Sequence, residues 1–189
     1  GNLDRTVGGP AVLPFIDPAL FQSSSKRTWH GRPDTDESTW RRSVYVFSKR
    51  SIPLPLLEVF DKPDTITSCA RRNRSTIAPQ ALIMMNDPMV LEASRVLAQR
   101  LMLENISQKE RIVKAFRLIL CRKALERELD LLQTYFEDER KYFEAEPEKA
   151  EERLKAGEYK QEKNSDVAGT AALMKVISTL YNTDEAITR

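Results

Sequence analysis

Histidine and cysteine are scarce in this 189-residue sequence, which contains only His30, Cys69 and Cys121. A zinc or non-haem iron site built on His30 needs at least one further nitrogen or thiolate ligand, and neither cysteine belongs to a C-x-x-C pair. A Ser-His-Asp triad would also have to use His30, which lies in a stretch rich in proline and glycine. The sequence therefore does not favour metal or nucleophilic catalysis, and we expect no cofactor in this chain.

Glycine is also scarce, with six residues, and neither a G-x-G-x-x-G nor a G-x-x-x-x-G-K phosphate-binding motif occurs. The longest apolar run, at 118–121, covers a few residues and is too short to cross a membrane. A formal net charge of +2 is too small to favour nucleic acid or an anionic surface as a partner. With 41% hydrophobic and 31% charged residues, the chain has the balance of a globular protein with a charged surface.

Proline divides the chain, because seven of its ten prolines occur before residue 64. Proline cannot donate a hydrogen bond within a helix or a sheet, so residues 1–75 are predicted to form a long extended arm that packs on the rest of the chain. Within the arm, residues 43–47 are rich in β-branched and aromatic side chains and are the one candidate for a strand. A short helix is expected at 56–60.

From residue 76 onward the pattern becomes helical. Asp87 followed by Pro88 predicts a helix start, with a capping carboxylate and a proline in the first turn. Ser107 and Glu110 have the spacing of a capping box, which predicts a second start. Residues 121–124 are expected to form a short non-helical break before another long helix. Cys121 is interpreted as a small buried hydrophobic residue.

The remaining apolar stripes predict two further helices. One stripe consists of Leu125, Leu129, Leu132 and Phe136, and the last consists of Leu173, Val176, Ile177 and Leu180. Between them, residues 144–165 are almost all charged or polar and are read as an exposed short helix plus a mobile loop. The fold class is therefore mainly α. Residues 76–189 are expected to form a bundle-like or orthogonal helical core with at most one short β-hairpin or strand in the whole chain.

A cluster of arginines is the most unusual feature of the composition. The arginines are Arg41, Arg42, Arg71, Arg72 and Arg74. Two aspartates, Asp61 and Asp87, are considered with them. Guanidinium groups bind carboxylate, phosphate or sulfate, so these residues are the candidate ligand-binding site. The alternative, which carries more weight, is that the arginines pair with nearby aspartates and helix ends and hold the arm in place.

Several motifs occur in a characteristic order: RRSVYVFSKRS at 41–51, FDKP at 60–63, RRNRST at 71–76, APQAL at 78–82 and NDP at 86–88. AFRLIL at 115–120 and LYNTDE at 180–185 follow them. With these motifs the chain resembles the C-terminal domain of unknown function in the large planctomycete cytochrome-c-associated multidomain proteins. That family usually has a glycine after the Phe-Arg-Leu segment, where this chain has Cys121, and an aromatic residue where it has Ala186.

The resemblance implies an exported protein, periplasmic or at the cell surface, with any haem in another domain of the full-length chain. It supplies no catalytic residue. The leading hypothesis is a non-catalytic interaction or scaffold domain at the C-terminal end, with the preceding domains of its own chain as partners. One alternative is part of a polysaccharide- or sulfated-glycan-processing enzyme whose site other domains complete, so the question of enzymatic activity stays open. The other is binding of an anionic polymer, whereas nucleic acid is not favoured.

Overall fold

A computed structural model of the chain describes residues 3–13, 40–48, 54–63, 67–71, 75–157, 159–162 and 165–188. They divide into two compact units, Gly1–Gln80 and Ala81–Arg189. Helices dominate, which confirms the mainly α fold, and the only β pairing among these residues consists of isolated bridges. Over the same ranges, no helix combines the length and the apolar character that crossing a bilayer requires. That the arm packs on the helical core stays a prediction.

In the first unit, residues 43–47 do not form the predicted strand. Ser43–Tyr45 is a 3-10 helix, η3, because the Val46 N–H donates to the carbonyl of Ser43 at 3.1 Å. Only the end of the segment is paired: Val12 donates to the carbonyl of Tyr45 at 2.8 Å, and Phe47 donates to the carbonyl of Val12 at 2.9 Å. The short helix expected at 56–60 is confirmed as α1, Pro55–Val59, with its proline in the first turn.

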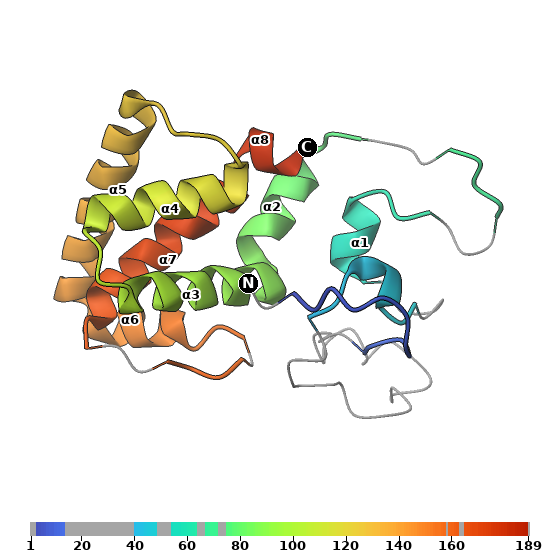
Figure 1. The fold of residues 1–189 in the computed structure, drawn as a ribbon, viewed down its shortest axis with the longest axis horizontal. Helices are drawn as coiled ribbons and strands as arrows, with labels where there is room; N and C mark the ends of the chain where they lie inside the picture. Colours follow the sequence, from blue (N-terminus) through green and yellow to red (C-terminus); the bar gives the residue numbers. More distant parts are fainter. Residues whose placement is uncertain are drawn as a thin grey trace. The chain divides into compact units, whose positions relative to one another are not determined.

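The second unit contains the helices of the core (Figure 1). Helix α2 (Ala78–Asn86) begins in the first unit and ends in the second. It is followed by α3 (Pro88–Leu103), α4 (Gln108–Leu120), α5 (Glu126–Ala145), α6 (Pro147–Leu154), α7 (Val167–Tyr181) and α8 (Asp184–Ile187). Both predicted helix starts are confirmed. The Asp87 carboxylate accepts a hydrogen bond from the Met89 N–H at 2.9 Å, and Ser107 and Glu110 form the capping box at the start of α4.

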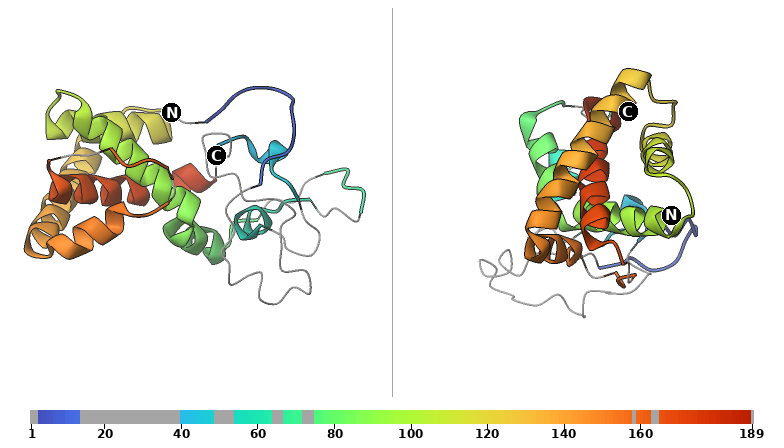
Figure 2. Two further views of the ribbon diagram at one scale, coloured as in Figure 1. Left: turned by 90° about the horizontal axis from the view of Figure 1, so that it is seen from below. Right: turned by 90° about the vertical axis from the view of Figure 1, so that its left-hand side faces the viewer.

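Helix α7 forms the centre of this unit and contacts α3, α4, α5, α6 and α8. It lies among the other helices in all three views (Figures 1 and 2). The sequence predicted one inward stripe, but nearly every side of α7 is covered, and Thr170, Ala171 and Ala172 are as inaccessible as Leu173. Small residues on the remaining sides of α7 allow neighbouring helices to approach it closely, and a helix that is apolar all round is a buried helix.

Two predictions at the ends of helices were wrong. Leu125 does not belong to the buried stripe of α5, because it stands before the first turn and 67% of its surface is exposed. Cys121 is exposed instead of buried, and it ends α4 in the left-handed conformation with a φ of 56°. Glycine adopts this conformation most readily, in agreement with the glycine that the resemblance leads one to expect at this position.

Candidate functional site

Arg41, one of the predicted ligand-binding residues, is hydrogen-bonded to backbone carbonyls of its own chain. Its guanidinium donates to the carbonyls of Thr6 at 3.1 Å and Pro10 at 3.0 Å, and also to the carbonyl of Gly8. The carbon at the centre of the guanidinium lies 3.9 Å from the centroid of the Tyr45 ring, and only 7% of the side chain is exposed. Arg41 therefore closes the Gly-Gly-Pro turn against η3.

Tyr45 is a shared contact for both neighbouring arginines. The Arg42 guanidinium lies 5.9 Å from the centroid of the same ring, on an exposed side chain. The Gly8 N–H donates to the Tyr45 hydroxyl oxygen at 2.9 Å, and this bond, together with Arg42 and Arg41, lowers the pKa of Tyr45. The structure thus brings Arg41 and Arg42 together around one tyrosine.

The other predicted residues lie elsewhere. In the first unit, Asp61 accepts hydrogen bonds from the backbone N–H and the hydroxyl of Ser75, at 2.6 and 2.7 Å. Arg71 is exposed, and its carbonyl accepts from the Cys69 thiol at 3.2 Å. Asp87, in the second unit, caps α3, and burial raises its pKa.

Arg72 and Arg74 lie outside the described residues, as does His30. Among the residues that are described, no three side chains of histidine, cysteine, aspartate or glutamate are grouped as a metal site requires. The assignment of the arginine cluster to ligand binding stays a prediction.

A buried arginine that the sequence analysis missed lies at the centre of a second polar cluster. Arg95, on α3, has no exposed surface. Its guanidinium donates to the carbonyls of Ala156 at 2.8 Å and Tyr159 at 2.7 Å, and to the Gln99 side-chain oxygen at 2.7 Å. Burial is the main cause that lowers the pKa of Arg95. The guanidinium thus fastens the loop between α6 and α7 to α3.

Two more side chains of α3 hold the same loop. Glu92 accepts from the Tyr159 N–H at 2.7 Å, and Gln99 donates to the carbonyl of Glu162 at 3.3 Å. The charged and polar residues of this loop predict a mobile segment, but side chains of α3 bind it. The available signal was the set of polar residues at positions 92, 95 and 99, which share the inward face of α3 with Val96. We call these contacts the α3 clasp.

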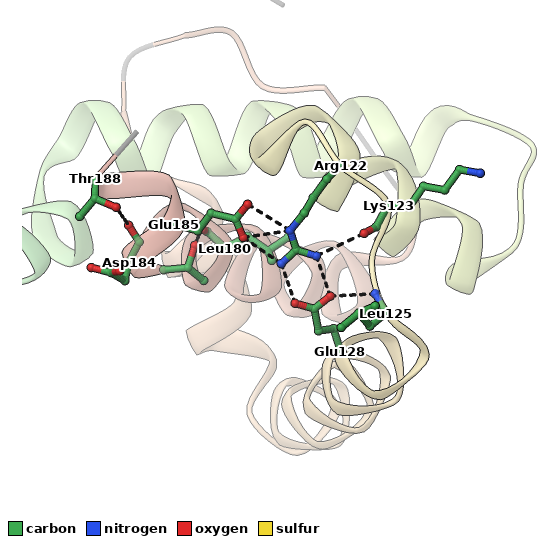
Figure 3. A network of polar contacts seen from close by, with 9 residues as sticks. Arg122, Lys123, Leu125, Glu128, Leu180, Asp184, Glu185 and Thr188 are labelled. Carbon is green, nitrogen blue, oxygen red and sulfur yellow. Dashed lines mark hydrogen bonds and ion pairs between the residues drawn. The ribbon is translucent and has the colours of Figure 1, made fainter.

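Arg122 connects three separate parts of the helical unit (Figure 3). Its guanidinium donates to Glu128 at 2.7 and 2.9 Å and to Glu185 at distances between 2.8 and 3.0 Å. It also lies 4.8 Å from the centroid of the Phe116 ring. Hydrogen bonds from Arg122 and from the Leu125 N–H lower the pKa of Glu128 to about 2. The turn after α4 is thereby joined to α5 and α8.

Three exposed apolar side chains lie within eight residues of one another in the sequence, on either side of the α2–α3 junction. Leu82 and Met85 on α2 are 63% and 53% exposed, and Met89 in the first turn of α3 is 45% exposed. Positions 82 and 85 share one face of a helix because they are three residues apart. We call these three residues the α2–α3 apolar patch.

The outer face of α4 borders a hollow of about 590 Å³. Its lining consists of Glu104, Ile106, Glu110, Val113, Lys114, Arg117 and Leu118. Five of these residues lie on α4 at the spacing of one helix face, opposite the buried Ile112, Ala115 and Phe116. Most of the accessible lining is apolar, with charged side chains around it.

The structure defines a mainly α protein in which Arg95 fastens a loop and Arg122 joins helix ends within the same chain. Residues 1–136 match the family described as "Protein of unknown function (DUF1553)", and the chain belongs to that family. No curated protein and no solved structure matches it. The matched residues end within α5, so α6, α7 and α8 lie beyond them.

Proposed function

We propose that this chain is a non-catalytic interaction domain that docks against the preceding domains of its own, larger protein. The observation that supports this proposal is the α2–α3 apolar patch, where Leu82, Met85 and Met89 present flexible apolar side chains to solvent. Methionine adapts its shape to a partner, and clustered exposed apolar side chains are typical of interaction sites.

The use of charge inside the chain supports the same proposal. Arg41, Arg95 and Arg122 each direct their guanidinium groups to acceptors of the same chain. Such arginines stabilise a rigid support, and a rigid support is what a docking domain needs. In the same proposal the full-length protein is exported and carries its c-type haem in another domain, as the resemblance to the cytochrome-c-associated proteins implies.

Methionine oxidation tests the docking surface. The full-length protein and this 189-residue chain are treated with hydrogen peroxide, and sulfoxide at each methionine is measured by mass spectrometry. We expect Met85 and Met89 to oxidise several-fold more slowly in the full-length protein, because a docked domain covers them. Met174, which is fully buried, is the internal control and should react slowly in both proteins. Equal oxidation of Met85 and Met89 in both proteins would contradict the proposal.

A pair of variants separates the patch from exposed apolar surface in general. Leu82→Asp in the full-length protein should restore fast oxidation of Met85 and Met89, because a carboxylate at the centre of an apolar contact prevents docking. Leu131→Asp is the matched control, since Leu131 on α5 is similarly exposed and lies outside the patch. It should leave the protection intact.

The glycan-processing alternative would require the predicted arginines and aspartates to converge on one ligand. In the first unit the Arg41 fork is occupied by backbone carbonyls, and Asp61 is occupied by Ser75. The anionic-polymer alternative depends on exposed cations such as Arg42 and Arg71. Retention of this chain on heparin with a steep salt dependence would favour these alternatives, and elution at low salt would leave the docking proposal in place.

A further inference from the structure

The outer face of α4 has a charge pattern that is complementary to itself. Glu110, Val113, Lys114 and Arg117 follow one another along this face, with Leu118 at its edge. Glu110 lies in the first turn of α4 and Arg117 in the last, so that opposite charges are about 10 Å apart along the axis. A face with an acid at one end and a base at the other matches a copy of itself in the reverse direction.

The two end charges differ in their surroundings: Glu110 is hydrogen-bonded, and the Arg117 side chain has no partner in the described part of the chain. Hydrogen bonds from Ser107 to the Glu110 carboxylate lower the pKa of Glu110, which keeps it ionised at neutral pH. The Arg117 side chain is exposed and has no hydrogen-bond or ion-pair partner among the described residues. A guanidinium group is not deprotonated in proteins.

We propose that the outer face of α4 binds the same face of a second copy of this chain, with the two helices antiparallel. A two-fold axis passing between Val113 and Lys114 places each Glu110 opposite Arg117 of the other copy, because 110 and 117 are equally far from the midpoint. The interface is isologous, so the charge pair forms twice. The antiparallel direction also brings opposite ends of the two helix dipoles together.

Lys114 lies close to the proposed axis, where two like charges would otherwise meet. In each copy its ammonium group is bound by both carboxylate oxygens of Glu104, at 2.6 and 2.7 Å. The pair is therefore neutral before the second copy arrives. Val113 and Leu118 supply the apolar contact between and beside the charge pairs. In the proposed dimer, these side chains of one copy enter the hollow of the other.

The proposed contact surface is small, so we expect the association to be weak. One face of a 13-residue helix is smaller than the surfaces of about 800 Å² per partner in stable complexes. We therefore expect a weak, concentration-dependent dimer that salt weakens further, since two of its contacts are exposed ion pairs. This surface is separate from the α2–α3 apolar patch, and either proposal can fail without the other.

Sedimentation velocity of the 189-residue chain tests the inference. Between about 5 μM and about 500 μM, the sedimentation coefficient should rise from that of a monomer toward that of a dimer. Arg117→Glu should weaken association at least about tenfold, because each pair then opposes two carboxylates. Arg127→Glu is the matched control, since Arg127 is an exposed arginine of α5 without a described side-chain partner, and its association should be unchanged.

Charge exchange provides the decisive variant. Glu110→Arg combined with Arg117→Glu restores the pairing with its polarity reversed, so association should return to within about threefold of the natural chain. The double variant loses half of the capping box, so its folded fraction is checked by circular dichroism. Leu118→Asp, which leaves both charges and the cap in place, should weaken association independently.

Three results would overturn the inference. The first is a chain that remains monomeric over the whole concentration range at low salt. The second is a dimer that Arg117→Glu and Leu118→Asp leave unchanged, which would place the contact on another face. The third is equal weakening by Arg117→Glu and Arg127→Glu, which would mean that net charge and not this face controls association.

Discussion

Replacing Arg95 by methionine removes the charge of the α3 clasp and retains much of the side-chain volume. Three well-formed hydrogen bonds disappear, to Ala156, Tyr159 and Gln99. Hydrogen bonds from a charged donor contribute about 1.5–3 kcal/mol each, but removing a buried charge also removes a desolvation cost of several kcal/mol. The loop carbonyls regain hydrogen bonds with water if the loop lifts away. We therefore expect Arg95→Met to lower the free energy of unfolding by about 2–4 kcal/mol.

Urea denaturation with amide hydrogen exchange measures this change. The urea midpoint should fall, and the Tyr159 amide, which donates to Glu92, should exchange faster than in the natural chain. Arg100→Met is the control, because Arg100 is an exposed arginine of the same helix. It should change stability by no more than about 0.5 kcal/mol.

Arg95 can be dispensable for stability if its buried charge costs as much as its hydrogen bonds contribute. Buried ion pairs in some proteins can be replaced by apolar residues without loss of stability. If Arg95→Met is as stable as the natural chain and the loop amides exchange no faster, then Arg95 does not hold the loop. The hydrogen bonds at 156–162 would then be a consequence of the fold and not one of its causes.

Three further predictions concern other parts of the second unit. A chain ending at residue 136, where the family match stops, lacks α7 and should show no cooperative thermal transition by circular dichroism; a sharp transition would contradict the central role of α7. The pKa of Glu128 in the folded chain, about 2, lies below its usual value of 4.5. The ion pair therefore contributes to the free energy of unfolding above pH 4.5, and this contribution is lost as the pH falls toward 2. Glu128→Gln should therefore lower the free energy of unfolding at neutral pH and reduce the fall of this free energy between pH 4.5 and pH 2, as measured by urea denaturation. If the free energy of unfolding falls as much as in the natural chain, the ion pair is not the cause of that fall. Cys121→Gly should raise the free energy of unfolding by about 0.5–1 kcal/mol, since glycine adopts a φ of 56° without steric cost, and equal or lower stability would contradict this.

The parts of the fold that could be predicted from sequence are those governed by local chemistry. Asp87 before Pro88, and Ser107 three residues before Glu110, determine helix starts because each capping group bonds to a backbone N–H within one turn. The short helix expected at 56–60 is α1, which begins one residue earlier because the first turn of a helix accepts a proline. These signals need no knowledge of the rest of the chain.

The errors occur where a distant contact decides the outcome. Residues 43–45 have the side chains of a strand, but Tyr45 contacts Arg41 and the Gly8 N–H, and the backbone turns to permit this. Arg95 lies 61 residues before Ala156, and no spacing rule links an arginine to carbonyls so far along the chain. Leu125 fits the apolar period of α5 but precedes its first turn, so periodicity alone placed it inside.

The candidate site shows the same division. Sequence composition identified the arginines as unusual, and the structure describes contacts to the same chain for Arg41 and Arg42. The sequence could not identify the α2–α3 apolar patch. Leu82 and Met85 have the spacing of buried residues and differ from them only because no other helix among the described residues covers them. The outer face of α4 likewise becomes visible only when α3, α5 and α7 are known to occupy its other side.

The position of α7 in the chain affects how this protein is made. A ribosome releases α3, α4 and α5 before the helix that covers their apolar faces, and synthesis proceeds at about 5–20 residues per second. The nascent chain therefore spends seconds with Leu101, Phe116 and Phe136 uncovered. Chaperones that bind exposed apolar segments can bind the nascent chain during this interval. The interval ends when α7 emerges and packs among the helices that were synthesised before it.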